Sequence, residues 1–185
     1  MKKPELLAPA GSFEKAKVAF MYGADAVYCG TASLSLRSRA EVDDNDLEKT
    51  IKYAHSIGKK VYAALNIYAW DTNYEEIEKQ VKMLDEVHVD AIIASDGGVI
   101  QKIREIAPNI EIHVSTQANV VSYHAAKFWY DNGAKRVILG RETSKDQIQE
   151  IMKNKPEDLE VEMFIHGALS VSYTHLRAHE TAANL

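Results

Sequence analysis

Short apolar runs alternate along the chain with longer segments whose apolar residues recur at helical spacing. In one of these longer segments, Leu47, Ile51 and Ala54 fall on a single helical face that would pack on a sheet. This alternation is typical of β/α units arranged around a parallel sheet. Seven strands are predicted, at Glu5–Ala10, Ala26–Gly30, Lys60–Asn66, Ala91–Ser95, Glu111–Gln117, Arg136–Glu142 and Val161–Gly167.

Residues that start and stop helices support these boundaries. Ser12 stands where an N-cap is needed, and Ser144-Lys-Asp-Gln147 has the spacing of a capping box. Gly23, Gly58 and Gly133 each stand where a helix should end and the chain should turn into the next strand through a left-handed residue. The sequence indicates no linker or second globular domain between these elements.

The spacing of the strands favours a barrel. Strand starts recur roughly every 20 to 35 residues, as in a (β/α)₈ barrel of about 250 residues. The alternative is an open doubly wound sheet, but Ala8-Pro-Ala-Gly-Ser12 has one glycine where a dinucleotide fold has G-x-G-x-x-G. We therefore predict an α/β fold, a truncated TIM-type (β/α)₈ barrel with about seven parallel strands present.

The composition is that of an ordinary globular domain, and it excludes few classes of binding partner. The chain has 185 residues, 46% of them hydrophobic and 26% charged, with a net charge of −5. A chain with this net charge has no overall positive potential that would attract nucleic acid, although a local basic patch remains compatible with it. The single cysteine, Cys29, rules out an internal disulfide framework. With no signal peptide or membrane span visible, we expect a cytoplasmic protein.

In either fold the ligand site lies beyond the carboxyl ends of the strands. The informative residues are therefore those where each apolar run turns polar. Such residues need hydrogen-bond partners or a functional reason to be there. The candidate substrate-binding residues are Asn66, Asp96, Gln117, Arg141, Glu142 and His166.

Each candidate has a functional and a structural interpretation. The amides of Asn66 and Gln117 could read a substrate carbonyl or base edge, or could fix a loop. Asp96 opens a helix, and its pattern favours an N-cap over an anion site. Arg141 and Glu142 would point to opposite faces of a strand. Arg141 suits bidentate binding of a carboxylate or phosphate, with a structural ion pair as the equal alternative.

Metal and nucleophile chemistry receive weaker support. His113 and His166 lie on predicted strands near the same end and could form a metal site with Glu162, but a hydrogen-bonded interior role is favoured for His113. Cys29 follows an apolar strand and is interpreted as a core residue rather than a nucleophile. The sequence contains neither an H-E-x-x-H nor a G-x-S-x-G motif, since His179-Glu180 is followed by Ala183 at the position of the second histidine.

Five motifs, in order, resemble the peptidase U32 family. The resemblance covers about residues 3–169, and the motifs that carry it are Glu5-Leu-Leu-Ala-Pro-Ala-Gly-Ser12, Gly23-Ala-Asp-Ala-Val-Tyr28, His113-Val-Ser-Thr-Gln117, Leu139-Gly-Arg-Glu142 and Glu162-Met-Phe-Ile-His-Gly-Ala-Leu169. The resemblance implies a TIM-barrel-like N-terminal domain. The family is named for collagenase-like proteases, but relatives hydroxylate transfer or ribosomal RNA. Others bind iron–sulfur clusters in oxygen-independent ubiquinone hydroxylation.

The opening Pro4-Glu-Leu-Leu-Ala-Pro-Ala-Gly11 is similar to the RNA-hydroxylating branch, which uses prephenate. This resemblance implies that the intact parent modifies RNA, by prephenate-dependent hydroxylation of a uridine in tRNA, and Arg141 would suit such a dicarboxylate. Peptide hydrolysis is the alternative enzymatic function, with a peptide as the substrate. A third interpretation is an inactive truncated fragment.

The end of the chain resembles translated DNA from a sequencing adapter. Residues 171–181, Val-Ser-Tyr-Thr-His-Leu-Arg-Ala-His-Glu-Thr, read as a translated transposase-end adapter. We therefore expect a partial U32-type barrel domain over residues 1–169 and a non-native tail over residues 170–185. Ser170 occupies the position of a family cysteine, so an iron–sulfur cluster would belong to the intact parent, and no cofactor is expected in this fragment. An unclosed barrel also predicts self-association through exposed strand edges.

Overall fold

The computed structural model describes residues 3–31 and 41–166; the predicted tail and Ser170 lie outside these ranges. One parallel sheet runs through the described residues in the order β1-β2-β4-β5-β6-β7-β8, and β3 pairs with β2 beside this path. The strands are β1 (Leu7–Pro9), β2 (Ala26–Thr31), β3 (Glu41–Val42), β4 (Lys60–Ala64), β5 (Ala91–Ala94), β6 (Glu111–Val114), β7 (Arg136–Ile138) and β8 (Glu160–Glu162).

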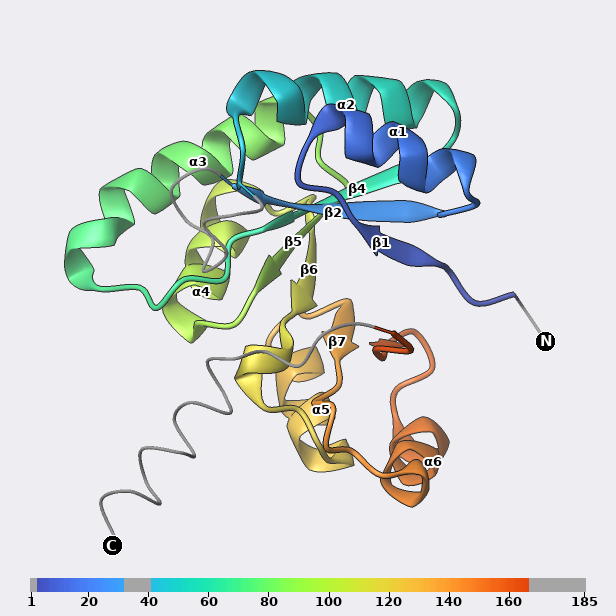
Figure 1. The fold of residues 1–185 in the computed structure, drawn as a ribbon. Coiled ribbons are helices and arrows are strands. Elements are labelled where there is room, and N and C mark those ends of the chain that lie inside the picture. Colours follow the sequence, from blue (N-terminus) through green and yellow to red (C-terminus); the bar gives the residue numbers. More distant parts are fainter. Residues whose placement is uncertain (1–2, 32–40, 167–185) are drawn as a thin grey trace, which may run out of the picture.

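The sheet is curled, and the helices lie on its outer side (Figure 1). They are α1 (Phe13–Met21), α2 (Asp44–Ser56), α3 (Tyr74–Glu86), α4 (Gly97–Ile106), α5 (Tyr123–Asp131) and α6 (Lys145–Asn154), with short 3₁₀ turns η1 (Asp71–Asn73) and η2 (Thr116–Ala118). Seven parallel strands thus form a curled half-barrel, which confirms the predicted α/β fold class of a truncated TIM-type barrel. In the described part of the chain, no helix is both long and apolar enough to cross a membrane.

Helix boundaries follow the local signals read from the sequence. Ser12 caps α1 by accepting from Lys15 N, and Ser144 with Gln147 forms the predicted capping box of α6. Gly23, Gly58 and Gly133 have φ angles of 99°, 67° and 92° after α1, α2 and α5, as a left-handed helix end requires. The prediction of these helix ends is confirmed.

His88 occupies the same position after α3 that glycine occupies after three other helices. Its φ angle is 58°, in the left-handed region that favours glycine. The next residue returns the chain to the sheet through a hydrogen bond from Val89 N to Leu84 O of 3.1 Å. The turn therefore has the geometry of the others, but a side chain with a Cβ adopts it at some energetic cost.

Two apolar layers hold the half-barrel together. The larger layer lies between the sheet and the helices and includes Val27, Leu47, Ile92 and Ile103. The smaller layer lines the inner face of the sheet, with Ala26, Tyr62, Ala64, Ala91, Ile93 and Ile138. This inner layer is small because several inward positions carry charged or polar side chains instead.

Six of the seven predicted strands are shorter than predicted and β2 is one residue longer, and one of these corrections affects the candidate site. The predicted strand Arg136–Glu142 ends at Ile138. Gly140 N donates to Val120 O at 3.0 Å, and Thr143 N donates to Gly140 O at 3.1 Å, so the chain turns there. Arg141 and Glu142 therefore lie in a turn, and the expectation that they alternate across a strand is wrong. The short strand β3 was not anticipated.

Candidate functional site

The predicted site residues lie at or beyond the carboxyl ends of the strands, on the rim where barrel enzymes bind ligands. Backbone pairing continues onto this rim: Leu65 N donates to Ile93 O and Ser115 N donates to Ala94 O, each at 2.8 Å. These hydrogen bonds fix the starts of the loops that carry Asn66 and Gln117. The Ser95 hydroxyl lies 3.5 Å from Gln117 Oε1, which brings the loops after β5 and β6 together.

Asp96 serves as the N-cap of α4. Its Oδ1 accepts from Gly98 N at 2.8 Å and from Val99 N at 3.0 Å, so the capping interpretation of this residue accounts for its contacts. The Tyr74 hydroxyl lies against Gly98, where an added Cβ would collide with it. Burial raises the pKa of Tyr74, and the nearby Asp96 carboxylate adds to this effect. The N-terminus of α4 is thus covered by its own N-cap, Asp96, and by Tyr74 of α3.

Asn66 differs from the other amides because its side-chain oxygen is buried and has no hydrogen-bond partner among the described residues. A buried polar atom without a partner costs free energy, so its retention needs an explanation. Asn66 follows β4 by two residues, at the rim where a ligand would approach. Its carbonyl oxygen is suited to accept a hydrogen bond from a ligand N–H or O–H.

Arg141 packs on an aromatic ring at the same rim. Its guanidinium carbon lies 4.2 Å from the centre of the Phe164 ring, in the segment that leaves β8. The contact holds the Arg141 guanidinium beside Phe164 at the rim. Glu142 is exposed, and its carboxylate lies against Gly140, where an added Cβ would be 2.9 Å from Oε2.

The histidines do not come together. His166, the last described residue, is exposed, whereas His113 is fully buried inside the sheet. Glu162 contacts Arg136 instead of a histidine. Within residues 3–31 and 41–166, no group of three or more histidine, cysteine, aspartate or glutamate side chains could hold a metal ion. The arrangement of His113, His166 and Glu162 considered from the sequence is therefore absent from these residues.

Cys29 is buried between the sheet and the helices, in agreement with its interpretation as a core residue. Burial raises the pKa of its thiol to about 12, so the nucleophilic thiolate is not accessible at neutral pH. It does not fit an iron–sulfur cluster either, because it stands alone and faces apolar side chains. Cluster ligands in an intact parent would have to come from other residues.

Sequence reasoning missed a charged cluster inside the half-barrel. Arg136, at the start of β7, donates from Nε and Nη2 to Glu160 Oε2 at 2.9 and 2.6 Å. Its Nη1 donates to Glu5 Oε1 at 2.8 Å and to Glu162 Oε2 at 3.2 Å. Tyr62 donates its hydroxyl to the same Glu5 oxygen at 2.8 Å. One guanidinium thus binds three carboxylates on the inner face of the sheet.

The environment of this cluster separates the pKa values of its carboxyl groups. Burial opposes ionisation of Glu5, but hydrogen bonds from Arg136 and Tyr62 outweigh it and lower its pKa. For Glu162, burial dominates over the attraction to Arg136, and its pKa is raised. The alternation Glu160-Val-Glu162 in β8 is the sequence signal that could have placed two carboxylates on one face.

His113 lies beside this cluster. Its ring packs edge-on against Tyr62 at 4.6 Å, and neither ring nitrogen has a hydrogen-bond partner among the described residues. Nε2 is 3.5 Å from Glu111 Oε2, a separation that allows attraction but falls outside hydrogen-bond geometry. Burial lowers the pKa of His113, although Glu111 opposes the shift. The predicted interior position is correct, but the expected hydrogen bond is missing.

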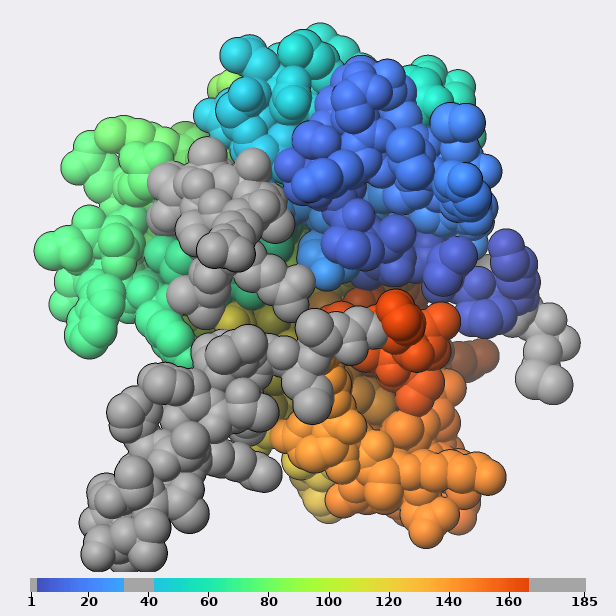
Figure 2. Space-filling view, viewed as in Figure 1, coloured from blue at the N-terminus to red at the C-terminus, as the bar shows by residue number. Residues whose placement is uncertain are grey.

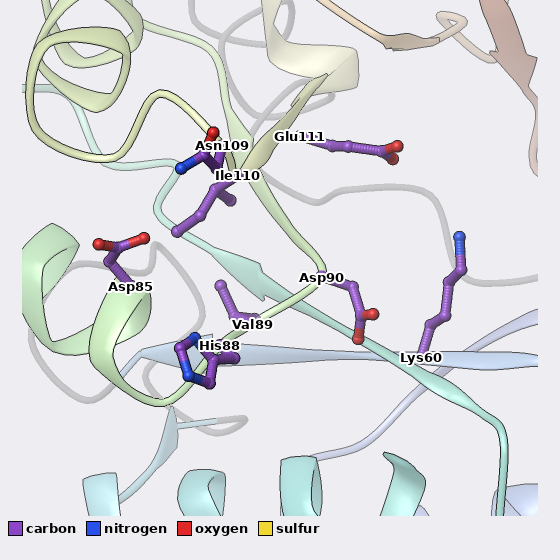
Figure 3. Close-up of a pocket in the computed structure, with 8 residues that line it drawn as sticks. All are labelled: Lys60, Asp85, His88, Val89, Asp90, Asn109, Ile110 and Glu111. Carbon is purple, nitrogen blue, oxygen red and sulfur yellow. The ribbon is translucent and has the colours of Figure 1, made fainter.

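A surface pocket of about 330 Å³ lies at the opposite end of the sheet, beside the amino ends of β4, β5 and β6 (Figure 3). Its charged lining includes Lys60, Asp90 and Glu111. Asp90 is already engaged, since its Oδ2 accepts from Val61 N at 2.8 Å. The pocket contains none of the predicted site residues, and in barrel folds the amino-terminal face contributes to stability rather than to ligand binding.

The curled parallel sheet, the outer helices and the polar rim define the class of protein as a TIM-like α/β barrel. A solved U32 peptidase structure has the same fold, with a TM-score of 0.68 and 14% identity, over 86% of this chain and 68% of that chain. The family model for peptidase family U32 matches residues 11–178. The chain belongs to peptidase family U32.

Two curated relatives are named for tRNA hydroxylation. The chain is 43% identical over 174 residues to tRNA hydroxylation protein P1 of Bacillus subtilis, covering 94% of this chain and 41% of the relative. It is 44% identical over 175 residues to tRNA hydroxylation protein P of Escherichia coli, covering 94% of this chain and 38% of the relative. The chain therefore spans about two fifths of the length of these relatives.

Proposed function

We propose that this chain is the N-terminal part of an RNA-modifying enzyme that hydroxylates a uridine in tRNA. The observation that carries the proposal is the identity of 43% and 44%, over 94% of the chain, to two proteins named for tRNA hydroxylation. Because the chain spans 41% and 38% of those relatives, the reaction is assigned to the whole protein and not to this part alone. Such a reaction would take place in the cytoplasm, where tRNA is available.

The site residues receive distinct roles in this proposal. Arg141, held against Phe164, would bind an anionic group, either a carboxylate of prephenate or a phosphate of the RNA. Asn66 would accept a hydrogen bond from the ligand through its unpartnered oxygen, and Gln117 would contribute a second amide from the neighbouring loop. Asp96 would act structurally as a helix cap. Glu142 and His166, both exposed, would border the same opening.

A chimera tests this function directly. Residues 1–169 of this chain would replace the matched part of the Escherichia coli relative, in a strain that lacks that relative. We expect hydroxylated uridine to reappear in tRNA digests analysed by mass spectrometry, and to disappear again when the strain cannot make prephenate. A soluble, folded chimera that leaves tRNA unmodified would contradict the proposal.

Peptide hydrolysis is the second candidate, and the family name together with the U32 peptidase fold supports it. At 14% identity that structure supports the fold alone. The same chimera, incubated with gelatin and casein, separates the two functions because a peptidase would release peptides without any effect on tRNA. The third candidate, an inactive truncated fragment, predicts that the 185-residue chain alone gives neither product.

A further inference from the structure

The inner face of the half-barrel has more negative than positive charge on its open side. In the described part of the chain, β1 pairs only with β2 and β8 pairs only with β7, so each has one unpaired edge. These two strands face one another across the open side (Figure 1). The side chains of the first and last described segments, dark blue and red, meet there on the surface (Figure 2).

The residues that border this open side are mostly acidic. β8 places Glu160 and Glu162 inward, since they align with Arg136 and Ile138 of the neighbouring strand. On the other border, Leu7 packs against the inner apolar layer, and Glu5 lies two residues before it on the same face. Arg136 binds all three carboxylates, and Lys60 adds a more distant attraction to Glu5, so the carboxylates still outnumber the cations that act on them.

We infer that the open side takes a parallel strand whose inward side chain is a lysine or arginine, supplied by the part of the longer family members that this chain does not span. A strand placed there would pair with both free edges, and its inward residue would lie between Glu5 on one border and Glu160 and Glu162 on the other. Barrels of this type close with eight strands, and seven are present on the main path.

Charge complementarity favours this occupant over a second copy of the chain, which pairs with these edges more weakly while the carboxylates are ionised. A second copy would bring its own Glu5, Glu160 and Glu162 to the same edge and would add like charges. An apolar strand would take the carboxylates further out of water with Arg136 as the one cation bonded to them, which is costly. The raised pKa of Glu162 agrees with a position that lacks a sufficient counter-charge. A lysine or arginine side chain from the added strand would supply a further positive charge to the three carboxylates and would donate hydrogen bonds to them.

The test compares the change in melting temperature that one substitution causes in two proteins, the 185-residue chain and a longer chimera. In the 185-residue chain, Glu162→Gln should leave the melting temperature unchanged or raise it, because it removes one of the excess carboxylates. In a chimera of residues 1–169 with the remainder of the Bacillus subtilis relative, the same substitution should lower the melting temperature, because it removes the partner of the incoming cation. Glu157→Gln is the matched control, because Glu157 is an exposed carboxylate just before β8. It should change the melting temperature of neither protein.

The cation is then located by substituting each lysine and arginine of the remainder with methionine in the chimera. One of these variants should lose stability, and Glu162→Gln should add little further loss in that background, as expected for a coupled pair. If the junction prevents folding, the remainder is supplied as a separate chain and the melting temperature of the complex is measured.

The same sign of the Glu162→Gln effect in both contexts would overturn the inference. So would the absence of any coupled cation, or the absence of both a folded chimera and a complex. None of these readouts depends on RNA modification, so the inference and the proposed function can fail separately.

Discussion

Replacing Arg136 with methionine should destabilise the chain strongly at neutral pH. The side chain is only 8% exposed and binds three carboxylates, of which Glu5 and Glu162 are 27% and 19% exposed. Removing one partner of a buried ion pair costs about 3–5 kcal/mol. Glu160 is 48% exposed and is stabilised by water, so the lower end applies and we expect a loss of about 3 kcal/mol in the free energy of unfolding.

The loss should shrink in acid. The folded-state pKa of Glu5 lies below its ordinary value of 4.5, so its contribution to stability is present above that value and disappears as pH falls through the folded-state pKa. In the variant this contribution is missing at every pH. The difference between wild type and variant should therefore be largest near pH 7 and clearly smaller well below the ordinary value of 4.5, near about pH 3.

Urea unfolding followed by circular dichroism at both pH values measures these differences. The neutral-pH loss corresponds to a fall in melting temperature of about 6–12 °C for a chain of this size. Arg104→Met is the matched control: Arg104 is exposed, contacts a backbone carbonyl, and should cost less than about 0.5 kcal/mol. A loss below 1 kcal/mol for Arg136→Met, or one that is equal at both pH values, would refute the argument.

Four further outcomes are expected. In the active chimera, Arg141→Lys should lower kcat/KM by roughly 10- to 100-fold with little change in melting temperature, because lysine cannot form the two parallel hydrogen bonds of a guanidinium. Unfolding with unchanged kinetics would assign Arg141 a structural role. His88→Gly should stabilise the chain by about 0.5–1 kcal/mol in urea, whereas Gly58→His should destabilise it; no gain would mean that the His88 side chain compensates for its left-handed backbone. Below pH 6.5 the melting temperature of the wild type should fall, because the pKa of His113 is lowered in the folded state and the unfolded chain binds the proton more readily. His113→Phe should make this decrease smaller. An equal decrease in wild type and variant would contradict the role of His113. Light scattering should show self-association of the 185-residue chain through the free edges of β1 and β8, strengthening as the carboxylates are neutralised in acid, and a monodisperse monomer at every pH would contradict it.

Most of the fold could be predicted because its signals are local. Buried parallel strands appear as short apolar runs, and helix caps lie within a few residues of what they cap. The position of the rim followed from the same pattern, since it is the place where each run turns polar. The end of β7 was misplaced because Gly140 forms a turn inside a segment whose composition still resembles a strand.

The inner cluster could not be predicted in the same way, because nothing near Arg136 in the sequence indicates its partners. Glu160, Glu162 and Glu5 lie 24, 26 and 131 residues away. Their convergence depends on the register of β7 with β8 and on the curl of the sheet, neither of which a single sequence specifies. The contact between Arg141 and Phe164 could not be predicted for the same reason, since it joins the segments after two different strands.

The separation of 131 residues between Glu5 and Arg136 also matters while the protein is being made. Closing a flexible loop of that length costs about 4 kcal/mol in chain entropy, so the contact forms only after the intervening β/α units have folded. At ribosomal rates the delay between the two residues is roughly 7 to 26 seconds. During that interval β1 can already pair with β2, but Glu5 has to wait for its counter-ion. The first strand of the nascent chain should therefore pair with β2 well before Glu5 reaches its final electrostatic environment.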